Sequence, residues 1–307
     1  MKILITCPPM LGKLGELEQE LQDQGLELIL PEVKQTMSEE QLAELLPLVD
    51  GWIAGDDPAT EGVLTIGAAG RLRAVVKWGV GIDNIDVDAC HKLGLKFSHT
   101  PAMFGDEVAD LALCYVIALA REVISIHQGV VDGGWPKPSG ISLKSKVVGV
   151  IGHGDIGKNV CKRLNAIGMK IVAYDPLIEH AEEYIDLRVW PSGIEDCDFL
   201  VFTCALNQNT YQMLNEEILS LCKDGVRIVN VARGGLIDES AMEKALDNGK
   251  VHSVALDVFE IEPLRHDSPL RLSSKNIFGS HNASNTLDAV ERTNERAVTQ
   301  LLNHLRI

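Results

Sequence analysis

The sequence predicts an α/β protein built from two doubly wound domains, each containing a parallel sheet. Three observations lead to this prediction: the length of 307 residues, an alternation of short apolar runs with amphipathic stretches that occurs twice, and a glycine-rich turn near the start of the second alternation. A chain of this length exceeds the usual size of one compact core, so two domains are expected. Alternating strands and helices are typical of a parallel sheet covered by helices.

The first alternation runs from residue 1 to about residue 100. Amphipathic stretches at 14–25 and around 38–46 are predicted to be helices, because their apolar residues recur at helical spacing. Strands are predicted at the apolar runs I-L-I (3–5), L-E-L-I-L (26–30), G-W-I-A-G (51–55) and R-A-V-V-K-W-G (73–79).

A long helix is predicted at 106–121, where the sequence is apolar on nearly all sides. Such a helix must be buried within the fold or against another subunit, and we therefore expect a homodimer. Residues 131–140 contain three glycines and two prolines, which predicts a loop or an extended arm. The second alternation then runs from K-V-V-G-V-I (146–151) to about residue 285, and an amphipathic helix is predicted at 287–305.

The composition excludes several classes of partner. Because the net charge is −16 and no lysine and arginine cluster is present, nucleic-acid binding through a basic surface is not expected. The longest apolar segment, 111–120, is shorter than the ~20 residues that span a bilayer, so no membrane partner is expected. The N-terminus is typical of a strand rather than a signal peptide. Seven scattered cysteines without metal-ligand spacing favour reduced core thiols, no metal site and a cytoplasmic location: Cys7, Cys90, Cys114, Cys161, Cys197, Cys204 and Cys222.

A dinucleotide-binding motif follows the strand predicted at 146–151. Gly152, Gly154 and Gly157 form G-x-G-x-x-G, in which the glycines allow a tight turn, a close approach of the pyrophosphate and close packing of helix on strand. Alone the pattern is weak, since glycine turns are common. Asp175, however, lies 18 residues beyond Gly157 after a further strand, where an acidic residue accepts hydrogen bonds from a ribose. A carboxylate there repels a 2′-phosphate, so the sequence favours NAD over NADP.

Three polar residues, Arg233, Glu262 and His281, each follow an apolar run that is predicted to be a buried strand. Alone, each residue type is more often structural or exposed than catalytic. Together they suit the oxidation of a 2-hydroxy acid: a guanidinium grips a carboxylate with two hydrogen bonds, an imidazole exchanges a proton near neutrality, and a carboxylate beside it stabilises its charged form. Strand ends are also where open α/β sheets place their chemistry.

The sequence segments around these residues resemble those of the D-2-hydroxyacid dehydrogenases, most of all the short phosphoglycerate dehydrogenases that lack a C-terminal regulatory domain. The matching segments are W-G-V-G-I-D-N-I-D (78–86), V-I-G-H-G-D-I-G (150–157), N-V-A-R-G-G-L-I-D-E (230–239), A-L-D-V-F-E-I-E-P (255–263) and the one around His281. The resemblance implies a Rossmann-like cofactor domain, residues 101–285, inserted into a flavodoxin-like substrate domain of residues 1–100 and 286–307. The active site is then expected between the domains.

The resemblance also implies roles for individual residues. Asp155 and Ile156 would meet the pyrophosphate, Asp175 the ribose, Cys204, Val231 and Ala232 would line the cofactor cleft, and Asp257 would hold the nicotinamide carboxamide. The amides of Gly79, Val80 and Gly81 would bind the substrate carboxylate opposite Arg233. Asp257 could instead be a helix cap or turn residue, and the 79–81 segment a simple strand-to-loop turn.

The chain departs from the family pattern next to the expected substrate site. Trp78 replaces a residue that is usually small, and its indole could narrow the pocket, stack on a substrate or point into the core. Lys77 and Lys137 are candidates for holding a distal phosphate, although exposed lysines are usually only solvated. Asp110 stands where Glu is usual, and Ser280 replaces a common proline before His281.

The expected reaction is direct hydride transfer between NAD and C2 of a small 2-hydroxy acid, with 3-phosphoglycerate and 3-phosphohydroxypyruvate as candidate substrates. Glu262 favours a hydroxy acid over formate, because the formate dehydrogenase branch places Gln there. Two alternatives stay open: a dehydrogenase for a different, non-phosphorylated acid, and an NAD-sensing corepressor that keeps the same Arg, Glu and His.

Overall fold

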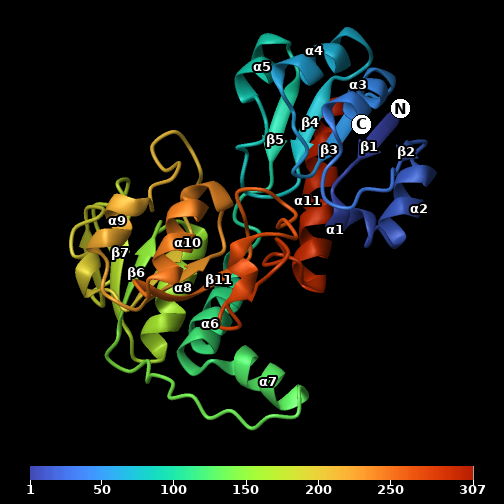
Figure 1. Cartoon of the computed structure of the whole chain (residues 1–307). Coiled ribbons are helices and arrows are strands. Elements are labelled where there is room, and N and C mark those ends of the chain that lie inside the picture. The colour runs from blue at the N-terminus through green and yellow to red at the C-terminus, as the bar shows by residue number, and fades with distance from the viewer. Residues whose placement is uncertain (307) are drawn as a thin grey trace. The chain divides into compact units, whose positions relative to one another are not determined.

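The computed structural model describes residues 1–306, which form two compact units. One unit contains Met1–Met103 and the chain from Asn285 to the C-terminus, and the other contains Phe104–Ser284. We call them unit 1 and unit 2. The sequence predicted the boundaries between the two domains at about residues 100 and 285. Figure 1 shows each unit as a sheet with helices packed on it.

Unit 1 has a five-stranded sheet in which every strand pair is parallel. Its strands are β1 (Lys2–Ile5), β2 (Glu27–Ile29), β3 (Gly51–Ala54), β4 (Ala74–Lys77) and β5 (Lys96–His99), in the order β2-β1-β3-β4-β5. This is the flavodoxin-like order, and its direction reverses between β1 and β3. Ligands of open parallel sheets bind at the carboxyl ends of the strands beside such a reversal.

The helices of unit 1 start at side chains that cap them. Ser38 and Gln41 form a capping box before α3, and Thr60 and Asp86 accept from the first turns of α4 and α5. The helices are α1 (Pro8–Leu11), α2 (Glu16–Asp23), α3 (Glu39–Leu45), η1 (Leu46–Leu48), α4 (Glu61–Ala69), α5 (Val87–Lys92) and α11 (Leu287–Leu305).

The last helix, α11, returns to unit 1 and packs on β3 and β4. Gly51 at the start of β3 allows this approach, because a Cβ there would lie 3.0 Å from Leu301 Cδ1. The final helix was expected to belong with the first part of the chain.

Unit 2 has a seven-stranded sheet, also parallel in every pair. Its strands are β6 (Val147–Ile151), β7 (Lys170–Tyr174), β8 (Ile185–Arg188), β9 (Phe199–Phe202), β10 (Val226–Asn230), β11 (Val251–Leu256) and β12 (Ile277–Phe278). The order β12-β11-β10-β9-β6-β7-β8 is Rossmann-like and reverses between β6 and β9. The predicted α/β fold with two doubly wound parallel sheets is confirmed.

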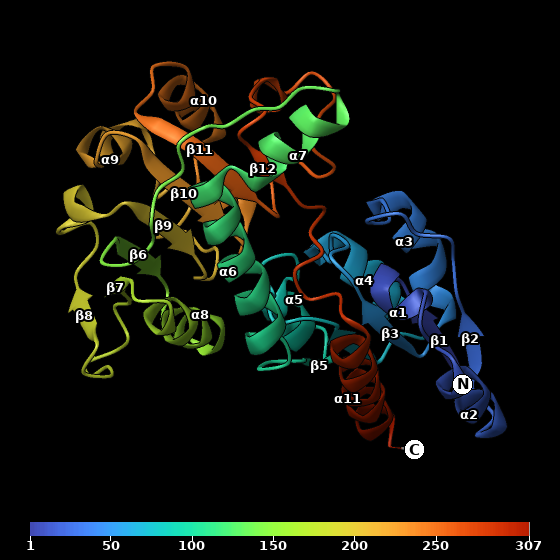
Figure 2. The same cartoon turned by 90° about the horizontal axis from the view of Figure 1, so that it is seen from below.

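The long apolar helix predicted at 106–121 is α6 (Gly105–Arg121), and it is buried within unit 2. It packs on α8, β10 and β11, and Figure 2 shows α6 and α8 side by side. Arg163 of α8 ties the two helices together, with Nε 2.6 Å from Asp110 and Nη2 2.8 Å from Asp106. The other helices of unit 2 are α7 (Val123–Val131), α8 (Asp155–Ala166), η2 (Ile194–Asp196), α9 (Glu216–Leu221), η3 (Gly234–Leu236), α10 (Glu239–Asp247) and η4 (Pro269–Leu272).

Several exposed apolar side chains of unit 2 lie together on α7 and the segment after it. No residue of α7 is buried, and Trp135 in the predicted arm is 76% exposed. We call this surface the α7 patch, and its members are Val123, Ile124, Val130, Val131 and Trp135. Figure 1 shows α7 and the following segment extending from the rest of unit 2. Unlike α6, α7 therefore has apolar side chains that are exposed to solvent and no buried residue.

The described residues contain no helix that is both long and apolar enough to cross a membrane. All seven cysteines are free thiols, of which Cys114 is exposed and Cys204 partly exposed. The prediction of core thiols is therefore right for the other five.

Candidate active site

Three glycines shape the turn between β6 and α8. Gly152 has a φ of +96°, and a Cβ on it would lie 2.7 Å from the backbone nitrogen of Cys204. A Cβ on Gly157 would lie 2.0 Å from the carbonyl oxygen of Gly152. In contrast, a Cβ on Gly154 would meet nothing within 4 Å. Gly152 and Gly157 are therefore required by packing, whereas Gly154 leaves open space in which a phosphate can approach the backbone.

Helix α8 starts at this open space. It begins at Asp155 and has 12 residues, and the first N–H groups of such a helix favour an anion. The carboxylate of Asp155 lies against α6, because a Cβ on Gly105 would be 2.6 Å from either of its oxygens. It is therefore the backbone of Asp155 and Ile156, rather than the Asp155 side chain, that suits a pyrophosphate.

Asp175 follows β7 and braces the glycine turn. Its Oδ2 accepts a hydrogen bond from the His153 amide at 2.8 Å, and its Oδ1 accepts one from the Leu177 amide at 2.9 Å. A carboxylate has about four acceptor sites, so these two bonds leave capacity for ribose hydroxyls. Sequence reasoning missed His153, which is buried with Nε2 3.3 Å from Glu182 Oε2.

The ends of β9 and β10 border the same turn. Thr203 Oγ1 donates to the carbonyl of Gly152 at 2.9 Å, which holds the neighbouring Cys204 against the turn. Burial raises the pKa of the Cys204 thiol to about 12, so this thiol is an apolar lining group rather than a nucleophile.

Asn230 at the end of β10 fixes the segment that carries Val231, Ala232 and Arg233. Its Oδ1 accepts from the Ala232 amide at 3.0 Å, and its Nδ2 donates to the Arg233 carbonyl at 2.8 Å. Val231 is buried and Ala232 is half-buried. The guanidinium of Arg233 also donates to the Ala232 carbonyl at 2.9 Å, so backbone and side chain are both held.

Asp257 follows β11 and is 1% exposed. Its Oδ2 accepts from the Ala283 amide at 2.8 Å, whereas its buried Oδ1 has no hydrogen-bond partner among the described residues. Burial raises the pKa of this carboxyl group. A buried acceptor without a donor is stabilised by a ligand that brings an N–H group, and the carboxamide of nicotinamide is such a ligand. Together with the space at Gly154, this acceptor makes the residues of unit 2 fit a nicotinamide dinucleotide.

Glu262 and His281 form a close pair. Glu262 Oε2 lies 2.8 Å from His281 Nδ1, and Glu262 Oε1 accepts from the Phe259 amide at 3.1 Å. His281 itself has a φ of +55°, a left-handed conformation that is uncommon for residues other than glycine. Because a carboxylate only accepts, the proton lies on Nδ1, and Nε2 is the nitrogen suited to proton exchange with a substrate.

Neighbouring strands of one sheet bring the three predicted catalytic residues to the same edge. Arg233 follows β10, Glu262 follows β11 and His281 follows β12, and these strands are adjacent. A Cβ on Gly234 would lie 1.8 Å from the carbonyl carbon of Phe259. The chain after Arg233 therefore touches the chain that leads to Glu262, which couples their positions.

Glu239 is a further residue of this edge that the sequence did not reveal. Its Oε1 accepts from the Glu260 amide at 2.7 Å, within the loop that carries Glu262. Burial, and after it the neighbouring carboxylates, raise the pKa of Glu239. The residue therefore positions the Glu262 loop.

In unit 1, the 79–81 turn differs from the expected three-amide anion site. The Gly79 amide donates to Thr100 Oγ1 at 2.8 Å, and the Gly79 carbonyl accepts from the Thr100 amide at 3.2 Å. The expectation that Gly79 offers its amide to a substrate is therefore wrong. Within the described part of the chain, the amides of Val80 and Gly81 donate no hydrogen bond, so these two remain candidates.

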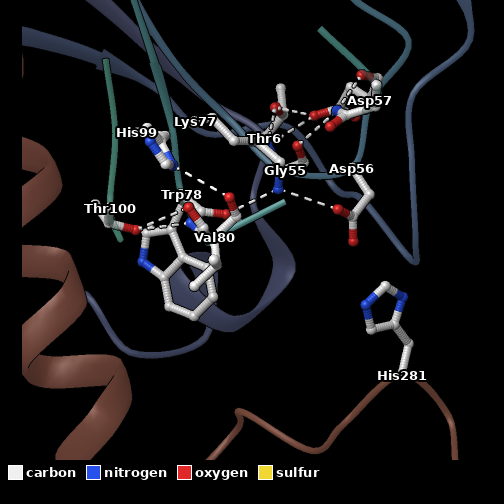
Figure 3. A network of polar contacts seen from close by, with 12 residues as sticks. Thr6, Gly55, Asp56, Asp57, Lys77, Trp78, Val80, His99, Thr100 and His281 are labelled. Carbon is white, nitrogen blue, oxygen red and sulfur yellow. Dashed lines mark hydrogen bonds and ion pairs between the residues drawn. The ribbon is translucent and has the colours of Figure 1, made fainter. Parts of the chain in front are cut away.

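Lys77 and Trp78 do not have the positions expected of substrate ligands. Lys77 is 3% exposed, and its Nζ lies 3.0 Å from Asp56 Oδ1 and 2.9 Å from the Trp78 carbonyl (Figure 3). Trp78 is 5% exposed, and its indole N–H donates to Asn294 of α11 at 2.8 Å. Of the three orientations considered for the indole, the one into the core is correct. Lys137 lies in the exposed segment after α7.

The described residues contain no group of three His, Cys, Asp or Glu side chains that could hold a metal ion.

Comparison with known proteins gives the family. Residues 113–283 match the model of the D-isomer specific 2-hydroxyacid dehydrogenase NAD-binding domain. The chain belongs to this family. Its cofactor is therefore NAD, and it is an oxidoreductase of the class that acts on CH–OH groups.

Individual relatives of this family member agree in fold and differ in their named substrates. The hydroxypyruvate reductase of Thermotoga maritima is 35% identical over 88% of this chain and 90% of its own length. The D-3-phosphoglycerate dehydrogenase of Sus scrofa is 34% identical over 93% of this chain but only 54% of its own length, so the chain spans about half of that relative. The structure is also similar to D-lactate dehydrogenase from Aquifex aeolicus complexed with NAD and lactic acid, with a TM-score of 0.86, 26% identity and coverage of 100% and 96% of the two chains.

The open space at Gly154 predicts a separation of cofactor binding from stability. Replacement by valine should leave the free energy of unfolding within about 0.5 kcal/mol of wild type, because a Cβ at this position has no protein atom within 4 Å. The same side chain should block the pyrophosphate and weaken NADH binding at least about tenfold, measured by quenching of protein fluorescence. As a control, Gly157→Ala should lower stability, since its Cβ has no room. Undiminished NADH affinity in Gly154→Val would contradict the assignment.

Proposed function

We propose that this family member transfers a hydride between C4 of the NAD nicotinamide and C2 of a small 2-hydroxy or 2-keto acid. The observation that carries the proposal is the His281–Glu262 pair at 2.8 Å, on the same sheet edge as Arg233. A proton-exchanging imidazole, a carboxylate that orients it and a fixed guanidinium are the groups that the reaction requires.

Each residue of the trio has one role in the proposal. Arg233 binds the substrate carboxylate with both arms of its guanidinium. In unit 1, the amides of Val80 and Gly81 are proposed as ligands of an anion. When a hydroxy acid is oxidised, His281 Nε2 takes the proton of the C2 hydroxyl as the C2–H bond breaks. Glu262 holds the Nδ1 proton and stabilises the imidazolium that results. When bound, NAD would supply the acceptor for the hydride.

The residues proposed to hold NAD lie after strands on both sides of the point, between β6 and β9, at which the strand order of unit 2 reverses. The open space at Gly154 and the first amides of α8, at Asp155 and Ile156, would bind the pyrophosphate, with Gly152 and Gly157 shaping the turn. Asp175 would accept from the adenosine ribose. Cys204, Val231 and Ala232 would line the path to the nicotinamide, and the unpaired Oδ1 of Asp257 would accept from its carboxamide.

Glu262 supports a hydroxy acid rather than formate, since formate oxidation passes no proton to an alcohol oxygen. The named relatives leave the acid open, because one acts on hydroxypyruvate and another on 3-phosphoglycerate by name. A phosphorylated substrate has less support than the sequence suggested, because Lys77 is buried and paired. The free thiols are consistent with our proposal of a cytoplasmic location.

A panel of 2-keto acids tests the proposal directly. With NADH in excess, we expect turnover of at least one acid among hydroxypyruvate, 3-phosphohydroxypyruvate, glyoxylate and branched keto acids, followed by the absorbance of NADH. A corepressor would bind NADH without such turnover. If no acid of the panel is reduced while NADH binds, the proposed activity is wrong.

Glu262→Gln tests the proton-transfer pair. The amide keeps the shape of the side chain but loses the charge, so the imidazolium is less stable and the pH range in which His281 can donate a proton moves down. We expect kcat/KM for keto-acid reduction at neutral pH to fall about ten- to a hundredfold and the alkaline limb of the pH profile to move to lower pH. Glu260→Gln, an exposed change two residues away, is the matched control and should alter neither. An unchanged profile in Glu262→Gln would refute the role.

We further propose that a second copy of the chain covers the α7 patch. A largely apolar helix without a buried residue is unfavourable in water, and a symmetric dimer is the commonest way to bury such a surface.

Two changes in α7 test the dimer. Wild type should sediment as a dimer, and a variant with Val123→Glu and Ile124→Glu should sediment as a monomer with unchanged circular dichroism. Both positions are about half exposed, and acidic residues suit the start of a helix. Leu177→Glu, at another exposed apolar position of unit 2, is the control that should remain dimeric. A wild-type monomer at micromolar concentration would disprove the proposal.

A further inference from the structure

Two polar side chains of unit 2, the carboxylate of Asp257 and the hydroxyl of Tyr115, meet at Gly279. Tyr115 lies on α6, which packs on β11, and Asp257 directly follows β11. A Cβ on Gly279 would lie 1.9 Å from Asp257 Oδ1 and 2.6 Å from Tyr115 Oη. Because both oxygens border one point, they lie close together, and no side chain of residue 279 separates them.

Neither oxygen is satisfied within the described part of the chain. Asp257 Oδ1 is buried and has no hydrogen-bond partner there. Tyr115 is 6% exposed, and its hydroxyl makes no hydrogen bond to residues 1–306 either. Buried polar groups nearly always have a partner, so two neighbouring exceptions indicate a place for a polar ligand.

The two oxygens differ in what they offer to a ligand. A carboxylate only accepts hydrogen bonds, whereas a phenol can donate one. Burial, and after it the charge of Asp257, raise the pKa of the Tyr115 hydroxyl, which therefore keeps its proton at neutral pH. The site thus presents one acceptor beside one donor. A primary carboxamide is complementary to it, because its NH₂ group donates and its carbonyl oxygen accepts.

The chain segment at this site is fixed to the end of β11. The Gly279 amide donates to the Leu256 carbonyl at 2.8 Å, and the His281 amide donates to the Asp257 carbonyl at 2.7 Å. A ligand that binds Asp257 and Tyr115 is therefore held by the same part of unit 2 that carries His281.

We propose that Tyr115 is a second ligand of the nicotinamide carboxamide, donating to its carbonyl oxygen while Asp257 accepts from its nitrogen. The inference rests on the proposed function, in which Asp257 binds the carboxamide, and it involves residues of unit 2 alone. One hydrogen bond leaves the carboxamide free to rotate about its bond to the ring. Two contacts of opposite kind decide which end faces Asp257, and they hold the nicotinamide in one orientation.

The test compares two ligands that differ in the nicotinamide. ADP-ribose ends before this ring, so NADH alone can contact Tyr115 through a carboxamide. By isothermal titration calorimetry, Tyr115→Phe should weaken NADH binding about three- to tenfold, the range of a neutral hydrogen bond, and leave ADP-ribose binding unchanged. The thermal midpoint of unfolding should stay that of wild type, because the lost hydroxyl has no partner within the described chain.

A thioamide analogue of NADH isolates the contact of Tyr115 from that of Asp257. Sulfur replaces the carbonyl oxygen in this analogue and accepts more weakly, whereas the NH₂ group is kept. Wild type should bind the analogue about threefold or more weakly than NADH. In Tyr115→Phe the two dinucleotides should bind alike, and in Asp257→Asn the difference should persist. The wild-type comparison decides the matter if Tyr115→Phe does not fold.

Tyr184→Phe is the matched control, since it removes the same hydroxyl elsewhere in unit 2. Tyr184 is 37% exposed and precedes β8, at the opposite edge of the sheet from β11 and β12. The ratio of the NADH and ADP-ribose affinities should be that of wild type in this variant.

The outcomes separate this inference from the proposed function. A folded Tyr115→Phe with the wild-type NADH affinity, or with NADH and ADP-ribose weakened equally, overturns the role of Tyr115. So does equal binding of NADH and its thioamide analogue to wild type. Asp257→Asn should itself weaken NADH at least about tenfold, because a hydrogen bond to an ionised acceptor is stronger. If it does not, the proposed role of Asp257 is wrong, and the role of Tyr115 falls with it.

Discussion

Every strand pair in both sheets is parallel, and the rest of the structure depends on this arrangement. Parallel strands direct all their carboxyl ends to one edge, so residues far apart in the sequence meet there without a dedicated scaffold. In unit 2 the edge gathers Gly152, Asp175, Arg233, Glu262 and His281, each directly after or within a short loop from a strand. Hydrogen bonds between the strands satisfy the backbone N–H and C=O groups of each sheet. The residues beyond the strand ends are therefore the ones available for chemistry.

Close contacts between backbone segments restrict the conformations of these loops. Gly152, Gly157 and Gly234 touch neighbouring main chain where a methyl group would not fit. Asn230 binds an amide and a carbonyl of the segment that follows it, and Asp257 binds an amide of another loop. Packing and hydrogen bonding therefore act on the same segments. The side chains that carry charge are held by loops that have little freedom, which is the condition for catalysis by orientation.

The sequence predicts the features that depend on local pattern. The strands before Gly152 and Arg233, the buried helix 105–121 and the adjacency of Glu262 and His281 follow from periodicity and from the family motifs. Features that depend on distant residues could not be predicted in this way. The Gly79 amide is occupied by Thr100, the indole of Trp78 is directed by Asn294, and Lys77 is paired by Asp56. Nothing in the neighbouring sequence of Gly79, Trp78 or Lys77 indicates these partners, because the fold alone brings them together.

The division of the chain into two units has an evolutionary consequence. On the proposed assignment, the proton-transfer pair and the cofactor residues are encoded in unit 2, whereas the 79–81 turn, proposed to bind an anion, is encoded in unit 1. Mutations in unit 1 can then change the acid that is accepted without disturbing the residues that carry out the reaction. Such modularity allows duplicated genes to acquire new substrates in few steps, and selection can act on specificity and on chemistry as separate traits.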